Sequence, residues 1–224
     1  MTNYTNNMTN KVNKSLFLTI EEHRHIELEA EKDGLDLMDL AAEAVTNYIE
    51  QLQFIKKKAI LILVGKGNNG GDGVSSAIKL IKLGYSITLL LMFDKLSPNT
   101  ANLIEKFKQL NGTVITDLPV NISKYEVIID AVIGIGISSG LDNKTQEIFN
   151  KINNSGKFIL AVDTPSGVNP FTGNVYPGAI KANTTLTFIA DKPGLYAAGA
   201  MDYVGDVIVD TLNDVQSLYI RHKL

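Results

Sequence analysis

The sequence has 224 residues, a formal net charge of −3 and no cysteine. A chain of this length can bury a sizeable apolar core, and its weak negative charge gives no reason to expect nucleic acid or a membrane surface as a partner. The lack of thiols excludes disulfides, thiolate metal sites and a cysteine nucleophile. The lack of cysteine leaves the redox compartment open, and a globular protein in the cytoplasm is the default expectation.

Residues 1–14 are rich in Asn and Thr and contain no apolar core. Secretory signals need such a core, so this stretch is interpreted as a flexible polar tail. The longest apolar runs, 59–64 and 87–93, have the length of strands and are far too short to cross a membrane. Residues 15–224 are expected to form a single domain, because no linker composition or internal repeat interrupts them.

After the tail, the chain alternates between helical and strand patterns. Two helices are expected within residues 18–48, with a break at Gly34. The elements that follow are a strand at 59–64, a helix ending at 83, a strand from 86, a helix at 99–110, strands at 113–115 and 126–132, a helix at 144–154 and a strand at 157–162. The final strands, 184–189 and 205–210, have no long helix between them, which indicates antiparallel or mixed pairing there.

This alternation predicts an α/β fold, a three-layer α/β/α Rossmann-like sandwich with a mostly parallel sheet. Ligands of such folds bind beyond the carboxyl ends of the strands. A glycine-rich loop, residues 65–73, follows the first strand and opens a helix, where backbone N–H groups can bind phosphate. The Gly-x-Gly-x-x-Gly spacing from Gly65 matches the dinucleotide fingerprint, and Asp94 follows the next strand. A tight turn with Asp72 as the helix N-cap is the structural alternative.

Other strand ends also carry polar residues. Asp130 begins a second glycine loop that runs to Gly140, which suggests a ligand held from both sides, with a buried acid that caps loop N–H groups as the alternative. Asp163 begins the turn Asp-Thr-Pro-Ser-Gly, where it is either a catalytic acid or a turn-stabilising residue. Lys192 lies in a turn after the strand at 184–189, where solvent exposure is the alternative.

In this order, these stretches resemble the NAD(P)H-hydrate epimerase family, also called the YjeF N-terminal domain. The resemblance rests on Asn-Asn-Gly-Gly-Asp at 68–72, Asp130 with Gly-Ile-Gly at 134–136, Asp-Thr-Pro-Ser-Gly at 163–167, and Thr-Leu-Thr-Phe at 185–188 with Lys-Pro-Gly at 192–194. It extends from about residue 16 to residue 212. It implies a homodimeric isomerase that interconverts the R and S epimers of hydrated NADH or NADPH.

The resemblance also implies which residues form the site. The hydrated dinucleotide is expected to contact two loops and one strand-end acid: Asn68, Asn69, Gly70, Gly71, Asp72, Gly134, Ile135, Gly136, Ile137, Ser138, Ser139, Gly140 and Asp163. A potassium ion is expected at Asn69, Asp130 and Ser166, whose carbonyl, carboxylate and hydroxyl oxygens suit a hard cation. Because relatives often fuse this domain to a dehydratase, a separate or fused NAD(P)H-hydrate dehydratase is the expected functional partner.

Two stretches depart from the family pattern. Residues 37–42 read Leu-Met-Asp-Leu-Ala-Ala in place of the usual Leu-Met-Glu-x-Ala-Gly, which shortens an acid and loses a glycine. Ile135 stands where a small hydroxyl residue is common, which removes a potential polar contact with the substrate. Neither departure removes an expected ion ligand.

Hydration of the nicotinamide ring places a hydroxyl on C6 beside N1, so epimerisation needs reversible bond opening there, aided by a general acid and base. Asp163 is the first candidate for this role, and Lys192 is the second, as proton donor or electrostatic partner. Two other functions remain as alternatives. One is an NAD(P)-dependent oxidoreductase that uses the Gly65 fingerprint and Asp94, and the other is a non-catalytic nucleotide-binding or protein-interaction module.

Overall fold

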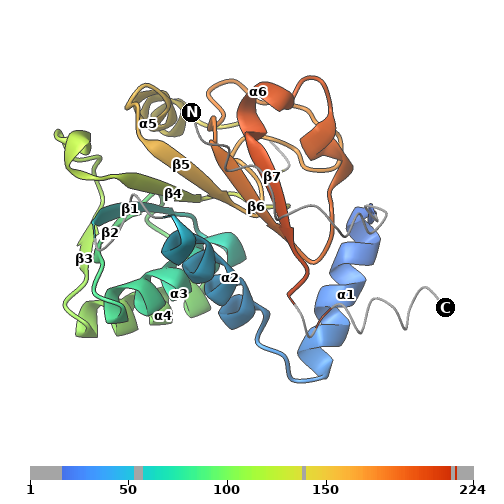
Figure 1. Ribbon diagram of the computed structural model, residues 1–224, viewed down its shortest axis with the longest axis horizontal. Coiled ribbons are helices and arrows are strands. Elements are labelled where there is room, and N and C mark those ends of the chain that lie inside the picture. The colour runs from blue at the N-terminus through green and yellow to red at the C-terminus, as the bar shows by residue number, and fades with distance from the viewer. Residues whose placement is uncertain (1–16, 53–57, 138–139, 213–214, 216–224) are drawn as a thin grey trace, which may run out of the picture.

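The computed structural model describes residues 17–52, 58–137, 140–212 and 215, so the expected tail at 1–14 lies outside the described residues. The described strands form one seven-stranded sheet in the order β3-β2-β1-β4-β5-β6-β7 (Figure 1). Their bounds are β1 Ala59–Val64, β2 Ser86–Leu91, β3 Thr113–Ile115, β4 Val127–Ala131, β5 Phe158–Val162, β6 Thr184–Phe188 and β7 Asp206–Asp210. The predicted strands are therefore confirmed to within a residue or two at their ends.

Helices cover both faces of this sheet. In Figure 1, α2, α3 and α4 lie on one face, and α5 and α6 lie on the other. The helices are α1 Ile20–Lys32, α2 Leu37–Gln51, α3 Asn68–Lys82, α4 Pro98–Gln109, α5 Asn143–Asn153 and α6 Met201–Val204, with short 3-10 turns η2 Ile122–Lys124 and η3 Pro193–Tyr196. The three-layer α/β/α sandwich predicted from the sequence is confirmed.

The sequence of β1 explains why both faces are covered. Successive strand residues point to opposite faces, so Ile60, Ile62 and Val64 join the core beneath α2, α3 and α4. Leu61 and Leu63 join the core beneath α5. A strand that is buried on both faces has to be apolar throughout, which is why β1 reads as an unbroken apolar run.

The expectation of antiparallel or mixed pairing at the end of the sheet is wrong. β7 pairs with β6 in parallel, with Thr184 opposite Asp206, as do all the other neighbouring strands in the described residues. The crossover between them uses η3 and the four-residue α6 in place of a long helix. Leu195 and Val204 of these turns are buried in a small apolar cluster with Val168, and this cluster stabilises the short crossover. Among the described helices, none is long and apolar enough to span a membrane.

Glycines allow the loop after β1 and the loop after β4 to pack closely against each other. An added Cβ at Gly65 would lie 1.8 Å from the carbonyl oxygen of Val132, and one at Gly73 would lie 2.5 Å from the Ala131 Cβ. The start of α3 therefore packs directly on the end of β4. This close packing brings both glycine loops to the same edge of the sheet.

We predict that Gly65→Ala destabilises the protein by about 2–4 kcal/mol, because the new methyl group displaces backbone that has no room to move. Urea denaturation measures the change in the free energy of unfolding. Gly67→Ala is the matched control, since a Cβ there meets nothing within 4 Å, and it should change stability by less than about 1 kcal/mol. Equal effects of the two substitutions would contradict the proposed close packing.

Candidate active site

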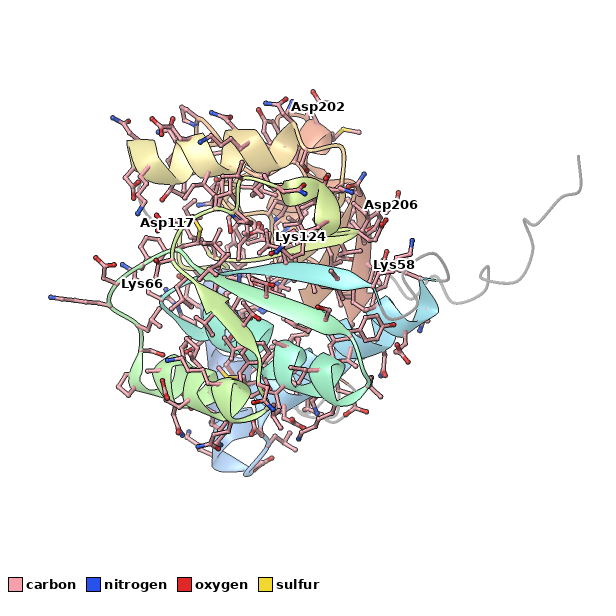
Figure 2. All side chains as sticks on the ribbon, turned by 90° about the vertical axis from the view of Figure 1, so that its left-hand side faces the viewer. Lys58, Lys66, Asp117, Lys124, Asp202 and Asp206 are labelled. Carbon is pink, nitrogen blue, oxygen red and sulfur yellow. The ribbon has the colours of Figure 1, made fainter. Side chains whose placement is uncertain are left out.

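A cavity of about 970 Å³ lies at the carboxyl ends of the strands. Figure 2 shows the two ends of the strands: Lys58 just before β1 and Asp206 at the start of β7 lie on one side, and Lys66 just after β1 lies on the other side. The loops after β1, β2, β4, β5, β6 and β7 contribute to the cavity wall, and so do α1 and the start of α2. Its lining includes His23, Glu27, Glu31, Asp36, Met38, Lys66, Asn68, Asn69, Asp72, Phe93, Asn99, Ile133, Gly134, Ile135, Gly136, Ile137, Gly140, Asp163, Ile189, Lys192 and Leu212.

The first glycine loop places the positive end of α3 at this cavity. Gly67 is the N-cap of α3, and Asn68, Asn69 and Asp72 line the cavity from its first turns. The interpretation of Asp72 as the N-cap is wrong, because it lies inside the helix. Burial, followed by the nearby Asp163 and Glu27 carboxylates, raises the pKa of Asp72 well above its ordinary value. Gly70 and Gly71 do not line the cavity; they are buried behind it.

Asp163 and Lys192 form a buried ion pair inside the cavity. The Lys192 ammonium lies 2.8 Å from Asp163 Oδ1, and the lysine side chain is 1% exposed. The same ammonium donates to Thr187 Oγ1 at 2.6 Å and to the Phe188 carbonyl at 3.2 Å. Its three donors therefore have three acceptors. Solvent exposure of Lys192, the alternative left open by the sequence, is wrong.

The backbone is strained where the strands enter the cavity. Asp163, Ile189 and Leu212 follow β5, β6 and β7, and they have φ angles of 69°, 71° and 47°. Residues other than glycine rarely adopt this left-handed conformation, and it is least favourable for a β-branched residue such as Ile189. Each strained residue costs about 1–3 kcal/mol, and such strain clusters at functional sites. All three line the cavity, so the strain lies at the candidate site.

The second loop brings Asn69 and Asp163 together. A Cβ added at Gly134 would lie 3.0 Å from Asp163 Oδ2 and 3.4 Å from Asn69 Cγ. Asn69 is 9% exposed, and neither Oδ1 nor Nδ2 of its amide has a hydrogen-bond partner among the described residues. A buried amide without partners costs about 1–3 kcal/mol, which a bound ligand or ion would recover.

Asp130 and Ser166 join the end of β4 to the turn after β5. Both are fully buried; Asp130 accepts from the Ser166 N–H at 2.7 Å and from the Ser166 hydroxyl at 2.6 Å. The Ser166 Oγ accepts in turn from the Ile133 N–H at 2.8 Å. Burial raises the pKa of Asp130 to about 6, against the opposing effect of these hydrogen bonds. None of the ion pairs in the described part of the chain includes Asp130.

The structure does not bring every expected residue to the cavity. Asp94 is exposed and does not line it, which leaves the dehydrogenase-type fingerprint without its ribose-binding acid. Ile135, Gly136, Ile137 and Gly140 do line it. Ser138 and Ser139 lie outside the described residues. Among the residues that are described, no group of three or more His, Cys, Asp or Glu side chains is placed to hold a metal ion.

Sequence reasoning missed the contribution of α1. His23 and Glu27 line the cavity, and His23 is 1% exposed. The available signal was their spacing of four residues, which places both on one face of the helix. From the sequence alone, that face resembles an ordinary solvent-exposed polar face. Only the fold shows that it lines the cavity.

Comparison with known proteins agrees with the geometry. Residues 34–194 match the family described as YjeF-related protein N-terminus. The chain belongs to the YjeF N-terminal family.

Two relatives in the YjeF N-terminal family differ in length. The NAD(P)H-hydrate epimerase of Limosilactobacillus reuteri is 36% identical over 210 residues, which cover 90% of this chain and 95% of that protein. The bifunctional NAD(P)H-hydrate repair enzyme Nnr of Dictyoglomus turgidum is 36% identical over 205 residues, which cover 87% of this chain but only 40% of that protein. The crystal structure of yeast ynu0, YNL200c, has a TM-score of 0.72 at 18% identity and covers 87% of each chain, which shows the same fold.

We predict that the Asp163–Lys192 pair is strongly coupled. Lys192→Met should lower the free energy of unfolding by about 3–5 kcal/mol, because it leaves a mostly buried carboxylate without its partner. The double variant with Asp163→Asn should lose less than the sum of the two single variants, as measured in a double-mutant cycle by urea denaturation. The exposed Glu105–Lys108 pair is the control and should show coupling below about 0.5 kcal/mol. Additive effects at 163 and 192 would contradict the ion pair.

Proposed function

We propose that this protein is an NAD(P)H-hydrate epimerase, an isomerase that interconverts the R and S epimers of hydrated NADH and NADPH. The observation that carries the proposal is the convergence of Asn69, Asp163 and Lys192 on one cavity, in a chain of the YjeF N-terminal family. The relatives named as epimerase and as repair enzyme support the same activity.

The substrate has a pyrophosphate and an altered nicotinamide ring, and the cavity offers a different surface to each. We place the pyrophosphate at the start of α3, because the first turn of a helix has N–H groups without intrahelical acceptors and the helix dipole favours negative charge there. The described residues of the loop after β4, 134–137 and 140, also line the cavity and would hold the substrate from the other side. The hydrated ring then lies toward Asp163, whose Oδ2 is not used by the ion pair.

Asp163 is placed to exchange a proton with the C6 hydroxyl of the hydrated ring. Epimerisation needs that hydroxyl to leave or the ring to open beside N1, and then to close again from the other face. Lys192 already donates to three acceptors, so in our proposal it positions Asp163 and stabilises its negative charge. A positioning role for Lys192 is preferred to proton donation for this reason.

Three residues have oxygen atoms that could bind the potassium ion expected from the family resemblance. Asn69 has a buried amide oxygen without a partner, and Asp130 is a buried carboxylate outside the described ion pairs. Ser166 adds a hydroxyl oxygen, and oxygen ligands of these kinds suit a hard cation. Asp130 and Ser166 are buried behind the cavity lining, so in this proposal a potassium ion would lie between the lining and these two residues and would supply positive charge and no redox chemistry.

The expected partners follow from the relatives. The Dictyoglomus protein, described as bifunctional, is more than twice the length of the matched region, so we propose that this chain works with an NAD(P)H-hydrate dehydratase, either separate or fused. We also propose a homodimer in the cytoplasm, where reduced nicotinamide cofactors are used. The oxidoreductase alternative is less well supported, because Asp94 lies outside the cavity.

We predict that the purified protein speeds equilibration of the two hydrate epimers, followed by chromatographic separation over time. Asp163→Asn should lower kcat by at least about 10²-fold, because it removes the acid–base group and keeps an acceptor for Lys192. Asp163→Ala should also abolish activity, but it leaves Lys192 buried without its partner. Asp94→Asn is the matched control and should keep full activity. A wild-type rate no higher than that of buffer would overturn the proposed function.

Potassium should raise the melting temperature of the protein more than sodium or choline chloride at equal ionic strength, because only the native state has the site. Asn69→Ala should remove this difference without lowering stability in choline, since the Asn69 amide has no partner in the described structure. Asp130→Asn should weaken the potassium dependence as well. An unchanged potassium titration in both variants would contradict the proposed ligands.

A further inference from the structure

α1 turns a polar stripe toward the cavity. His23, Glu27 and Glu31 are spaced by four residues, lie on one face of the helix and all line the cavity. The neighbouring face holds Ile26 and Ala30, which are buried in the main core. Core packing therefore explains the apolar face of α1 and leaves the polar stripe unexplained.

His23 is the most constrained member of the stripe. It is 1% exposed, its ring meets Phe171 edge to face at 5.9 Å, and its Nε2 has no hydrogen-bond partner among the described residues. Burial, followed by the Lys192 charge, lowers the pKa of His23 to about 4, so the imidazole is neutral at physiological pH. A buried, unpaired nitrogen on the wall of a cavity points to a polar atom of a ligand as its partner.

Glu27 lies one turn further along the same face and is half-buried. Burial and then the Asp163 carboxylate raise its pKa, so Glu27 keeps its proton at a higher pH than an ordinary glutamate. The other charged groups that shift the pKa of Glu27 are Glu31 and Arg24 of α1 and Lys192 after β6. Glu27 in turn helps to raise the pKa of Asp72 in α3. Among these, Asp163 is paired with the lysine and Glu27 is not.

Inversion at one carbon is helped by two proton-exchanging groups, one on each face of the ring. The hydroxyl leaves from one face of the ring, and water returns to the other face. Asp163 comes from the sheet edge and Glu27 comes from α1, a separate element that Figure 1 places beside the ends of β6 and β7. A ring bound in the cavity between these elements would have a carboxyl group available from each.

We propose that α1 forms a second catalytic wall, in which Glu27 exchanges a proton with the C6 oxygen of the hydrated ring and His23 Nε2 hydrogen-bonds a polar substituent of that ring. This inference rests on the proposed epimerase function.

In one direction of the reaction, the Glu27 carboxylic acid protonates the C6 hydroxyl. The C6–O bond then breaks, and both of its electrons leave with the oxygen, as water. The N1 lone pair forms a C6–N1 double bond. Water then adds to the opposite face and gives its surplus proton to the Asp163 carboxylate, and the reverse direction exchanges the two roles.

Glu27→Gln tests the proposal, because it keeps the shape and removes the exchangeable acid. We expect kcat for epimerisation to fall on the order of 10²-fold with KM changed by less than about threefold. The wild-type rate should fall as pH rises through the pKa of Glu27, and this alkaline limb should be missing in Glu27→Gln. Glu27→Asp should retain the limb at reduced kcat. Glu21→Gln, the same change at an exposed position of α1, is the control.

The outcomes separate this proposal from the proposed function. An active wild-type enzyme with near-normal kcat and an unchanged pH profile in Glu27→Gln overturns the role of Glu27 and leaves the epimerase function intact. An inactive wild-type enzyme overturns the function itself. If Glu27→Gln does not fold, as judged by circular dichroism, the pH profile of Glu27→Asp decides, and an unaltered limb position and kcat in that variant also overturn the role.

His23→Phe gives a second, independent measurement. It keeps an aromatic ring against Phe171 and removes the unpaired nitrogen, so the melting temperature should stay the same or rise. KM for the hydrate should increase about two- to tenfold, the value of one lost hydrogen bond. His23→Asn is used in its place if the larger ring is not accommodated. An unchanged KM in a folded His23 variant overturns the substrate contact.

Discussion

The buried ammonium of Lys192 constrains the geometry of the whole cavity. A charge that is 1% exposed is tolerated only when its three donors meet acceptors, and these come from Asp163, Thr187 and the Phe188 carbonyl. The acceptors belong to β6 and to the turn after β5, so the lysine ties two neighbouring strand ends together. Asp163 is thereby held in one orientation, with its other oxygen beside Gly134.

This anchoring also explains how the strained backbone persists. Asp163 and Ile189 adopt left-handed backbone angles directly after β5 and β6, and each is held by a strand-type hydrogen bond, from Asp163 N–H to Leu186 and from Ile189 N–H to Asp210. Strain of about 1–3 kcal/mol per residue survives only where the surrounding contacts over-determine the conformation. The parallel sheet supplies those contacts, and it turns the side chain of Asp163 into the cavity.

The sequence predicted most of the fold because local patterns decide most of it. An unbroken apolar run such as 59–64 has few structures other than a buried strand, and glycines after such a run mark the loop that approaches a ligand. The pairing of β7 could not be predicted, because it depends on a small cluster around Leu195 and Val204 that forms only in the folded chain. Asp72 lines the cavity as expected, and the alternative interpretation as an N-cap failed because α3 begins earlier, at Asn68.

The candidate site was predictable only where it lies on strand ends. Asp163 and Asn69 follow strands and were found, because the fold class says where such residues meet. His23 and Glu27 lie on α1, whose position relative to the sheet is set by the packing of Ile26 and Ala30 in the core. No local sequence pattern indicates where this helix packs. The burial of Lys192 was also invisible, since a lysine in a turn is usually exposed.

The charge balance of the cavity connects its parts. Asp72, Glu27 and Asp163 face the same space with Lys192 as the paired cation, so an anionic pyrophosphate would be repelled if every acid were ionised. The raised pKa values of Asp72 and Glu27 reduce that repulsion, because a protonated acid carries no charge. The start of α3 supplies positive dipole charge, and a potassium ion beside Asn69 would supply more. Raised pKa values at Asp72 and Glu27 therefore favour binding of the anionic dinucleotide in the proposed function, because they lower the negative charge of the cavity.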